Sequence, residues 1–192
     1  MARPREFDKQ AAIETTMQVF WEKGYKATSI GDLITATGLK PGSIYSAFCN
    51  KRTLFLLALE TYCEKLQQAI YPILDADKPA KEVIYEFFNC FLNDLNSTPQ
   101  GCFLVNTLFE TPQSDGEVLE KVHAQFSAIE QKFMHLLERA RSEGHLAPNL
   151  DPEIQSKLLI NLIYGLRGYS KTQPNQPSLC ELKNEFLRTL FP

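Results

Sequence analysis

Apolar side chains recur along this chain mainly at the three- and four-residue spacing of one face of an α-helix. The first such stretch, residues 8–23, ends at Gly24. Two short stretches with the same spacing follow, at residues 30–37 and 41–48. No segment alternates apolar and polar residues over several positions, so the pattern predicts an all-α fold with no sheet.

The two short helices are expected to be joined by a tight turn. Thr28 or Ser29 can cap the first of them through a hydroxyl. Gly38 lies where this helix must end, because glycine adopts the left-handed conformation without a Cβ penalty. Pro41 suits the first turn of the next helix, where its missing N–H would be unpaired anyway. The segment therefore predicts a helix-turn-helix.

Apolar residues on both short helices hold the pair together. Ile30 and Leu33 share a face of the first helix, and Ile44 and Phe48 are four apart on the second. In a helix-turn-helix, such packing leaves the outer face of the second helix free to enter the major groove of DNA. The alternative is an ordinary helical hairpin with no ligand.

The helical pattern resumes at Lys51 and predicts six further helices. Pro72 and residues 75–79 are expected to break the first of them after Ile70. The predicted helices are 51–70, 79–95, 102–109, 118–143, 151–166 and 178–190. We therefore expect two domains, a three-helix DNA-binding domain at residues 1–50 and a helical ligand-binding and dimerisation domain at residues 51–192.

Charge is distributed unevenly between the two halves. The chain has 192 residues and a net charge of −3. Residues 1–60 hold eight Lys or Arg and six Asp or Glu, a net charge of +2, and the rest of the chain carries −5. A basic N-terminal part suits DNA, and the acidic remainder limits non-specific binding. No apolar run is long enough for a membrane span or a signal peptide, so a cytoplasmic protein without membrane contact is expected.

The sequence contains no pattern of catalytic or metal-binding residues. The five cysteines have no zinc spacing, and the three histidines are far from them in sequence. There is no nucleophile–base pair and no phosphate-binding glycine loop. We therefore expect no metal, no cofactor and no enzymatic activity.

Residue identities in the N-terminal segment carry a more specific signal. The runs 24–30, 42–48 and 50–55 (GYKATSI, GSIYSAF and NKRTLF) closely resemble the TetR family of bacterial repressors. The resemblance is specific over residues 7 to about 60 and weak beyond. It implies a homodimer whose N-terminal domains bind double-stranded operator DNA, and whose larger domains bind a small-molecule effector that releases the DNA.

The same resemblance implies which side chains contact DNA. Phosphate contacts are expected from Thr28, Tyr45 and Lys51, and a base-facing edge from Lys40, Pro41, Gly42, Ser43 and Ser46. Lys40 departs from the family, which often has a Ser or Thr cap at that position. Ile34 also departs, because it replaces a small residue and predicts looser packing of the two helices.

The N-terminal arm adds two basic residues. Arg3 and Arg5 can reach phosphates or the minor groove, as arms on related folds do, or they belong to a solvated terminus. Trp21 falls within the apolar face of the first helix, which favours packing over base stacking.

A ligand pocket is expected between the aromatic helix 79–95 and the short helix 102–109, with few polar groups. The candidate lining residues are Tyr62, Phe87, Phe91, Cys102, Phe103, Asn106 and Glu110. Asn106 and Glu110 have structural capping and surface charge as their alternative roles. Cys102 follows Gly101 at a helix N-terminus, where a thiolate is stabilised, so it is either an electrophile or oxidant sensor or a packed residue.

The last two helices are rich in Leu and Ile. In the TetR family the equivalent pair forms a four-helix bundle between subunits; the alternative is that these helices only close the monomer core. The sequence thus predicts a ligand-responsive repressor that binds a palindromic operator as a dimer. The competing classes are an all-helical ligand carrier or enzyme and a non-specific DNA-packaging protein.

Overall fold

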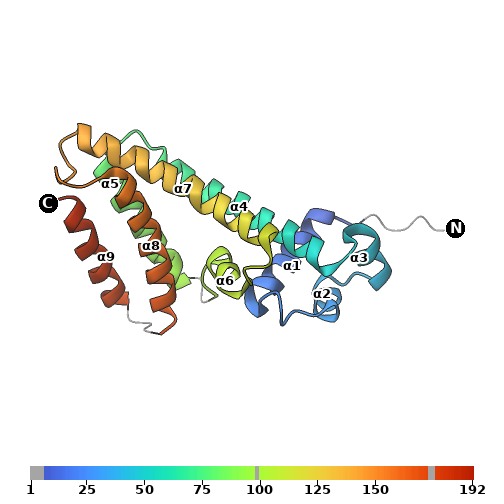
Figure 1. Cartoon of the computed structure of the whole chain (residues 1–192). Coiled ribbons are helices and arrows are strands. Elements are labelled where there is room, and N and C mark those ends of the chain that lie inside the picture. Colours follow the sequence, from blue (N-terminus) through green and yellow to red (C-terminus); the bar gives the residue numbers. More distant parts are fainter. Residues whose placement is uncertain (1–6, 98–99, 173–175) are drawn as a thin grey trace.

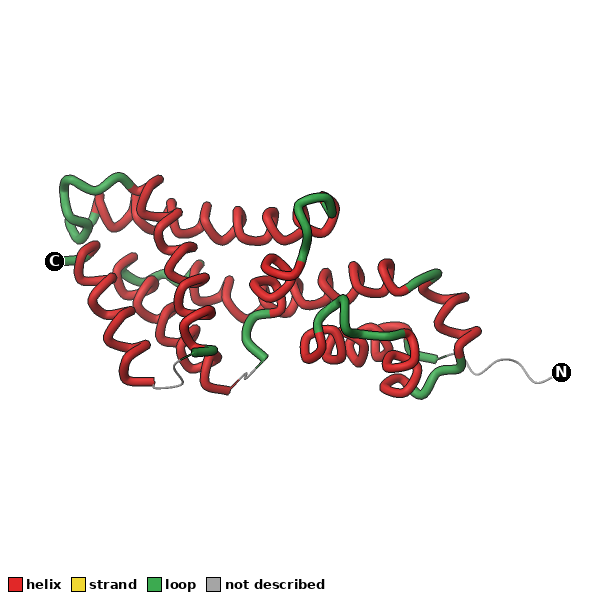
Figure 2. The backbone as a smooth tube through the Cα atoms, turned by 60° about the horizontal axis from the view of Figure 1, so that its bottom comes forward, coloured by secondary structure: helices red, strands yellow, loops and turns green. Residues whose placement is uncertain are grey.

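The computed structural model describes residues 7–97, 100–172 and 176–192, and all regular structure in them is helical (Figures 1 and 2). The described residues form these helices: α1 Lys9–Lys23, α2 Ile30–Thr37, α3 Pro41–Phe48, α4 Lys51–Leu74, α5 Ala80–Ser97, α6 Phe103–Glu110, α7 Gly116–Ser142, α8 Pro152–Ser170 and α9 Gln176–Leu190. The predicted all-α class is confirmed, and the predicted helix ends differ by a few residues.

Helices α1, α2 and α3 and the first turns of α4 share one core at one end of the molecule (Figure 1). Phe20 of α1 is fully buried and meets the Phe55 ring of α4 edge to face, with 5.2 Å between the centroids. Leu33 of α2 and Ile44 of α3 are also buried. Burial of these side chains stabilises the small helices, which are too short to be stable alone.

The start of α2 and the turn between α2 and α3 have the predicted capping residues. The Ser29 hydroxyl accepts from the Asp32 N–H, and the Asp32 carboxylate accepts from the Ser29 N–H, which forms a capping box. Gly38 ends α2 with a φ of 66°, the left-handed conformation that glycine adopts at least cost. Pro41 opens α3, whose N-cap residue Lys40 makes no side-chain cap.

Replacing Ser29 with alanine is expected to lower the free energy of unfolding by about 1 kcal/mol, because the Asp32 N–H loses its acceptor. Urea denaturation followed by circular dichroism measures the change. Ser127→Ala is the matched control, since Ser127 is exposed in the middle of α7. Equal stability of the two variants would contradict a stabilising role for the cap.

The prediction that Pro72 breaks the helix after Ile70 was wrong. Helix α4 continues through Pro72 to Leu74. Proline inside a helix removes one backbone hydrogen bond and commonly kinks or ends the helix, but here two further residues keep the helical conformation. The α4 chain ends instead at Asp75, whose N–H donates to the Tyr71 carbonyl. As a result, one continuous helix runs from the N-terminal core into the body.

The body consists of α4 to α9 (Figure 1). The long helices α4 and α7 lie side by side, and α8 packs along α7. Phe88 of α5 stacks on Phe133 of α7 in the centre, where both side chains are fully buried. Arg52 at the start of α4 makes a two-pronged ion pair with Asp115 just before α7, with N–O distances of 2.6 and 2.7 Å. This pair links the N-terminal end of α4 to the body.

Candidate DNA interface and ligand cavity

Helix α3 presents a continuous polar edge to solvent. Lys40, Pro41, Gly42 and Ser46 are exposed, and Tyr45 keeps 51% of its surface accessible. Ile44 and Phe48 are buried beneath them, which leaves the opposite face outward. The structure therefore brings five of the predicted DNA-contacting residues onto one surface.

Ser43 is less exposed than these residues, and Gly42 has free space around it. Ser43 is half-buried, and its carbonyl accepts from the Ser46 hydroxyl at 3.2 Å. A Cβ added at Gly42 would meet no atom within 4 Å, so packing inside this chain does not require glycine there. The missing side chain keeps the backbone of α3 open to close approach from outside.

A cationic group lies beside α3 at the start of α4. The Lys51 ammonium is 4.4 Å from the centroid of the Tyr25 ring, a distance at which a cation–π contact stabilises it. Partial burial lowers the pKa of Lys51, and the nearby Asp32 charge opposes that change. Lys23 is held by Asp32 at 2.6 Å, and this bond keeps the pKa of that carboxyl far below its usual value.

Thr28 does not lie on this surface. Its side chain is only 2% exposed, and its hydroxyl donates to the Gly24 carbonyl at 2.7 Å. The hydroxyl thus stabilises the turn after α1, so the predicted side-chain contact to phosphate does not fit the structure. Arg3 and Arg5 lie outside the described residues.

An apolar cavity of about 260 Å³ lies in the body between α4, α5, α7 and α8. Its walls are mostly aliphatic and aromatic, which is typical of ligand sites. The lining residues are Tyr62, Lys65, Leu66, Ala69, Ile70, Ile73, Phe87, Cys90, Phe91, Asp94, Cys102, Phe126, Ile129, Ile163 and Arg167.

Four of the predicted ligand-binding residues line this cavity, namely Tyr62, Phe87, Phe91 and Cys102. The Tyr62 hydroxyl donates to Cys102 Sγ at 3.4 Å. Burial, together with the neighbouring Cys102 thiol, raises the pKa of Tyr62 well above its ordinary value. Tyr62 is therefore a neutral hydrogen-bond donor inside an apolar space.

Phe103 was predicted to line the pocket, but it does not. Its buried ring packs edge to face on Tyr62 at 5.6 Å and on Phe55 at 5.8 Å. These contacts put Phe103 between the cavity wall and the N-terminal core. It therefore supports Tyr62 from behind rather than facing the cavity.

Asn106 and Glu110 are also outside the cavity, contrary to the prediction. The Asn106 amide donates to the Gln100 carbonyl, and its oxygen accepts from Lys171. The Glu110 carboxylate lies against Gly24 of the N-terminal part, where a Cβ would come within 2.5 Å of it. The two side chains thus contact other parts of the fold instead of the cavity, which the sequence spacing did not reveal.

Sequence reasoning missed the charged groups of the cavity. Arg167 on α8 is 5% exposed and donates to Asp94 on α5, and its guanidinium lies 4.7 Å from the centre of the Phe91 ring. Its spacing of four from Ile163 placed it on the buried face of that helix, which is the signal that could have identified it. Lys65 pairs with Glu14 of α1 at 3.1 Å.

Within residues 7–97, 100–172 and 176–192, no three His, Cys, Asp or Glu residues are grouped as a metal site would need. In the same part of the chain, no helix combines the length and apolar character of a membrane span.

Two family patterns match this chain. Bacterial regulatory proteins of the tetR family match residues 12–58, and the tetracyclin repressor-like C-terminal domain matches residues 80–178. The second match covers half of the chain. The two matches coincide with the helix-turn-helix and with most of the helical body.

The relatives of this chain are regulators. It is 27% identical to the transcriptional repressor ComR of Escherichia coli over 99% of this chain and 91% of that protein. It is 32% identical to the uncharacterised regulator YezE of Bacillus subtilis over 76% of each chain. A cysteine mutant of the TetR family regulator CifR, solved with a 26-base-pair operator, has a TM-score of 0.86 and 26% identity over the whole of both chains.

The resemblance at the N-terminus thus extends over the whole fold. The helix-turn-helix and the exposed edge of α3 lie in the first matched region, and the part of the cavity wall that comes from α5, α7 and α8 lies in the second. The chain therefore belongs to the TetR family and is a ligand-responsive, DNA-binding transcriptional regulator, not an enzyme.

Proposed function

We propose that this protein is a repressor that binds a palindromic operator as a homodimer and is released when a small molecule enters the cavity. The observation that carries the proposal is the exposed edge of α3, with Tyr45 and Lys40 outward on a helix held by a buried Ile44. A dimer contacts two half-sites at once, which explains how so short a helix can achieve specificity.

Residues of the α3 edge divide into two proposed roles. Tyr45 and Lys51 hold phosphates, since a hydroxyl and an ammonium are donors that fix a protein on the DNA backbone. Lys40, Ser43 and Ser46 face base edges in the major groove, and Pro41 and Gly42 allow the backbone to approach. Arg3 and Arg5, at the start of the DNA-binding domain, supply further cationic groups to the same DNA.

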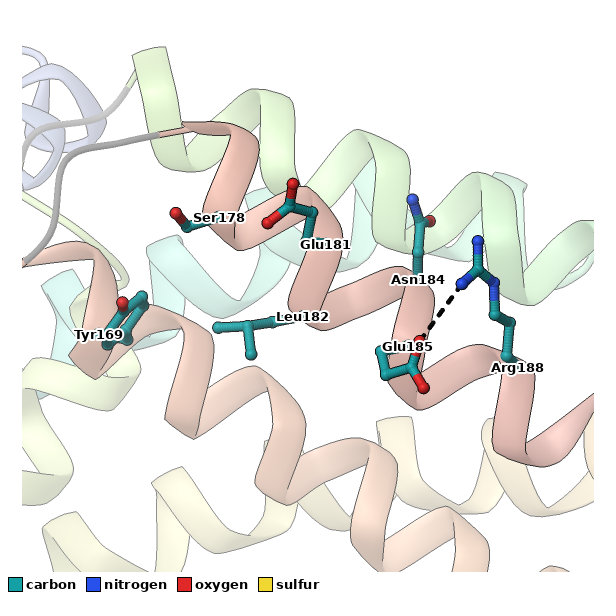
Figure 3. Close-up of a pocket in the computed structure, with 7 residues that line it drawn as sticks. All are labelled: Tyr169, Ser178, Glu181, Leu182, Asn184, Glu185 and Arg188. Atoms are coloured by element: carbon teal, nitrogen blue, oxygen red, sulfur yellow. Dashed lines mark hydrogen bonds and ion pairs between the residues drawn. The ribbon is translucent and has the colours of Figure 1, made fainter.

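The proposed dimer surface is the outer face of α8 and α9. Ile154, Leu158 and Tyr169 are exposed on α8, and Leu182 is exposed on α9. Figure 3 shows Leu182 between the two helices beside a shallow groove that Tyr169 also lines. Apolar side chains gathered on one face in this way are typical of subunit contacts. A second copy of this chain would form a four-helix bundle there.

Several contacts link the cavity to the DNA-binding part, and we propose that they transmit the effector signal. The Trp21 indole N–H of α1 donates to the Gly101 carbonyl at 2.9 Å, next to Cys102. The Trp21 ring also meets the Tyr62 ring edge to face at 5.1 Å. A ligand that moves Tyr62 or the 101–102 segment thereby moves α1, and with it α2 and α3.

We also propose a role for Cys102 in effector binding. The Cys102 thiol lines the cavity, so an electrophile that enters would meet it, and covalent capture is the alternative to reversible binding.

Residues 1–50 serve as the DNA-binding domain and residues 51–192 as the effector and dimer domain, with the first turns of α4 completing the N-terminal core. Such a regulator would act in the cytoplasm, where bacterial DNA is.

Selection of bound fragments from random duplex DNA at near-physiological salt tests the proposal. We expect a palindromic site with half-sites about one helical turn apart, or a multiple of that spacing, because two α3 helices of a dimer read successive major grooves. Strong but sequence-independent, salt-sensitive binding would instead indicate non-specific packaging of DNA. Failure to bind any DNA would favour the ligand carrier.

A further inference from the structure

A buried guanidinium with unused donors lies in the cavity wall. Arg167 is 5% exposed, and its Nη2 donates to the Asp94 carboxylate. Its Nε and Nη1 atoms are buried and have no acceptor among the described residues. Buried N–H groups almost always have a partner, and leaving them unpaired is costly, more so for a charged group. Arg167 lines the cavity, and an oxygen atom of a bound ligand would satisfy these donors.

A second donor faces the same space. The Tyr62 hydroxyl donates to Cys102 Sγ, and a thiol sulfur is a weak acceptor. An oxygen entering the cavity can replace that sulfur as the acceptor. Because its pKa is raised, Tyr62 keeps its proton across the physiological range and remains available as a donor.

Charge at the cavity favours an anion. Among the lining residues Arg167 pairs with Asp94, and Lys65 pairs with Glu14 of α1, so the formal charges of the two pairs balance. The Asp94 side chain is 49% exposed to solvent, whereas that of Arg167 is 6% exposed. Water therefore screens the charge of Asp94 more than that of the buried guanidinium.

The remaining wall favours a small apolar body on the ligand. Isoleucine, leucine and phenylalanine side chains make up most of it, including Ile70, Ile129 and Phe87. The volume of about 260 Å³ lies just below the range of roughly 300–1,000 Å³ that ligand sites usually occupy. A short aliphatic or aromatic molecule fits this volume better than a long one.

We propose that the effector is a small apolar carboxylic acid, bound as its carboxylate by Arg167 and Tyr62 with its hydrocarbon part against the apolar wall. The inference rests on the proposed function in that this cavity is taken as the effector site. Charge-assisted bonds of this kind are stronger than neutral ones and orient the ligand. The hydrocarbon part would also press on Tyr62, which contacts Trp21.

Calorimetric titration of the full-length protein with octanoate, octanol and octylamine tests the ligand class. The three probes share one chain and differ in headgroup charge. We expect octanoate to bind at least about tenfold more tightly than the other two, because only a carboxylate pairs with the guanidinium. Trp21 is the single tryptophan, so its emission reports binding at the wall independently. Equal or tighter binding of octanol or octylamine, or no binding of any probe, would overturn the proposal.

Variants of the charged pair give changes in opposite directions. Arg167→Gln is expected to lower the affinity for octanoate about tenfold or more and to change the affinity for octanol by less than threefold. Asp94→Asn is expected to raise the affinity for octanoate a few-fold, because it removes a carboxylate that repels the ligand. A destabilised fold cannot produce a gain, so Asp94→Asn remains informative if Arg167→Gln folds poorly. Lys157→Gln is the matched control, an exposed cation on the same helix. Weaker octanoate binding by a folded Asp94→Asn would contradict the assignment.

Operator affinity, measured with and without octanoate, separates the two levels of the proposal. If the protein does not bind an operator even without a probe, the repressor function is wrong. The calorimetric comparison of octanoate with octanol would still test the ligand class of the cavity. If the operator is bound while octanoate shows no advantage over octanol, the ligand class is wrong and the repressor function stands.

Discussion

Replacing Leu158 with glutamate is expected to convert the dimer into monomers and to lower operator affinity by at least about a hundredfold. Leu158 is 41% exposed on α8, in line with Ile154 one turn earlier, on the surface proposed to meet the second copy. A carboxylate buried there without a partner costs several kcal/mol. A monomer also loses the gain of roughly 10²–10⁴ that simultaneous binding of two half-sites provides.

Sedimentation velocity at micromolar concentration measures the oligomeric state, and a gel-shift titration measures operator affinity. Ser127→Glu is the matched control, because it adds the same charge at an exposed position on α7. A Leu158→Glu protein that remains dimeric would show that α8 does not form the subunit contact. A wild-type monomer at this concentration would exclude the proposed dimer altogether.

Replacing Tyr45 with alanine is expected to lower operator affinity by about ten- to a hundredfold, since a dimer loses two hydrogen bonds to phosphate, each worth about 0.5–1.5 kcal/mol. The fold should be unaffected, because Tyr45 is 51% exposed and lies outside the buried side of α3. The slope of log affinity against log salt should stay the same, because the lost group is uncharged. Lys51→Gln should reduce that slope by about two per dimer.

Phe109→Ala is the control for Tyr45→Ala, because Phe109 is an exposed aromatic residue on α6, 71% accessible. Fluorescence anisotropy with the selected operator at several salt concentrations measures both quantities. If Tyr45→Ala and Phe109→Ala bind equally well, α3 does not face DNA through Tyr45. A changed salt slope in Tyr45→Ala would indicate a wider rearrangement of the interface.

Local signals predicted the helix-turn-helix well because each of them acts within a few residues. Ser29 caps a helix through Asp32 three residues later, and Gly38 ends the same helix by its own backbone conformation. Neither depends on the rest of the fold. Thr28 failed as a surface residue for the opposite reason. Its hydroxyl can donate either to solvent or to the Gly24 carbonyl, and the packing of the turn favours the carbonyl.

The ligand cavity was only partly predictable, because it joins residues from four helices distant in sequence. The spacing on α5 identified Phe87 and Phe91, whose periodicity fixes a shared face. Asn106 and Glu110 share a face by the same argument, but periodicity does not reveal whether that face meets the cavity or another helix. Arg167 was missed because its partner, Asp94, is 73 residues away in sequence.

The amino-acid sequence by itself determined the helical class of this protein, the position of its helix-turn-helix and its membership of the TetR family, since short-range periodicity, caps and residue identities carry that information. Only the tertiary structure decided that Pro72 lies inside a helix, that Glu110 turns toward Gly24, and that Arg167 lies buried with two unused donors. These outcomes depend on how whole helices pack, and the energy of that packing is shared among residues far apart in the chain.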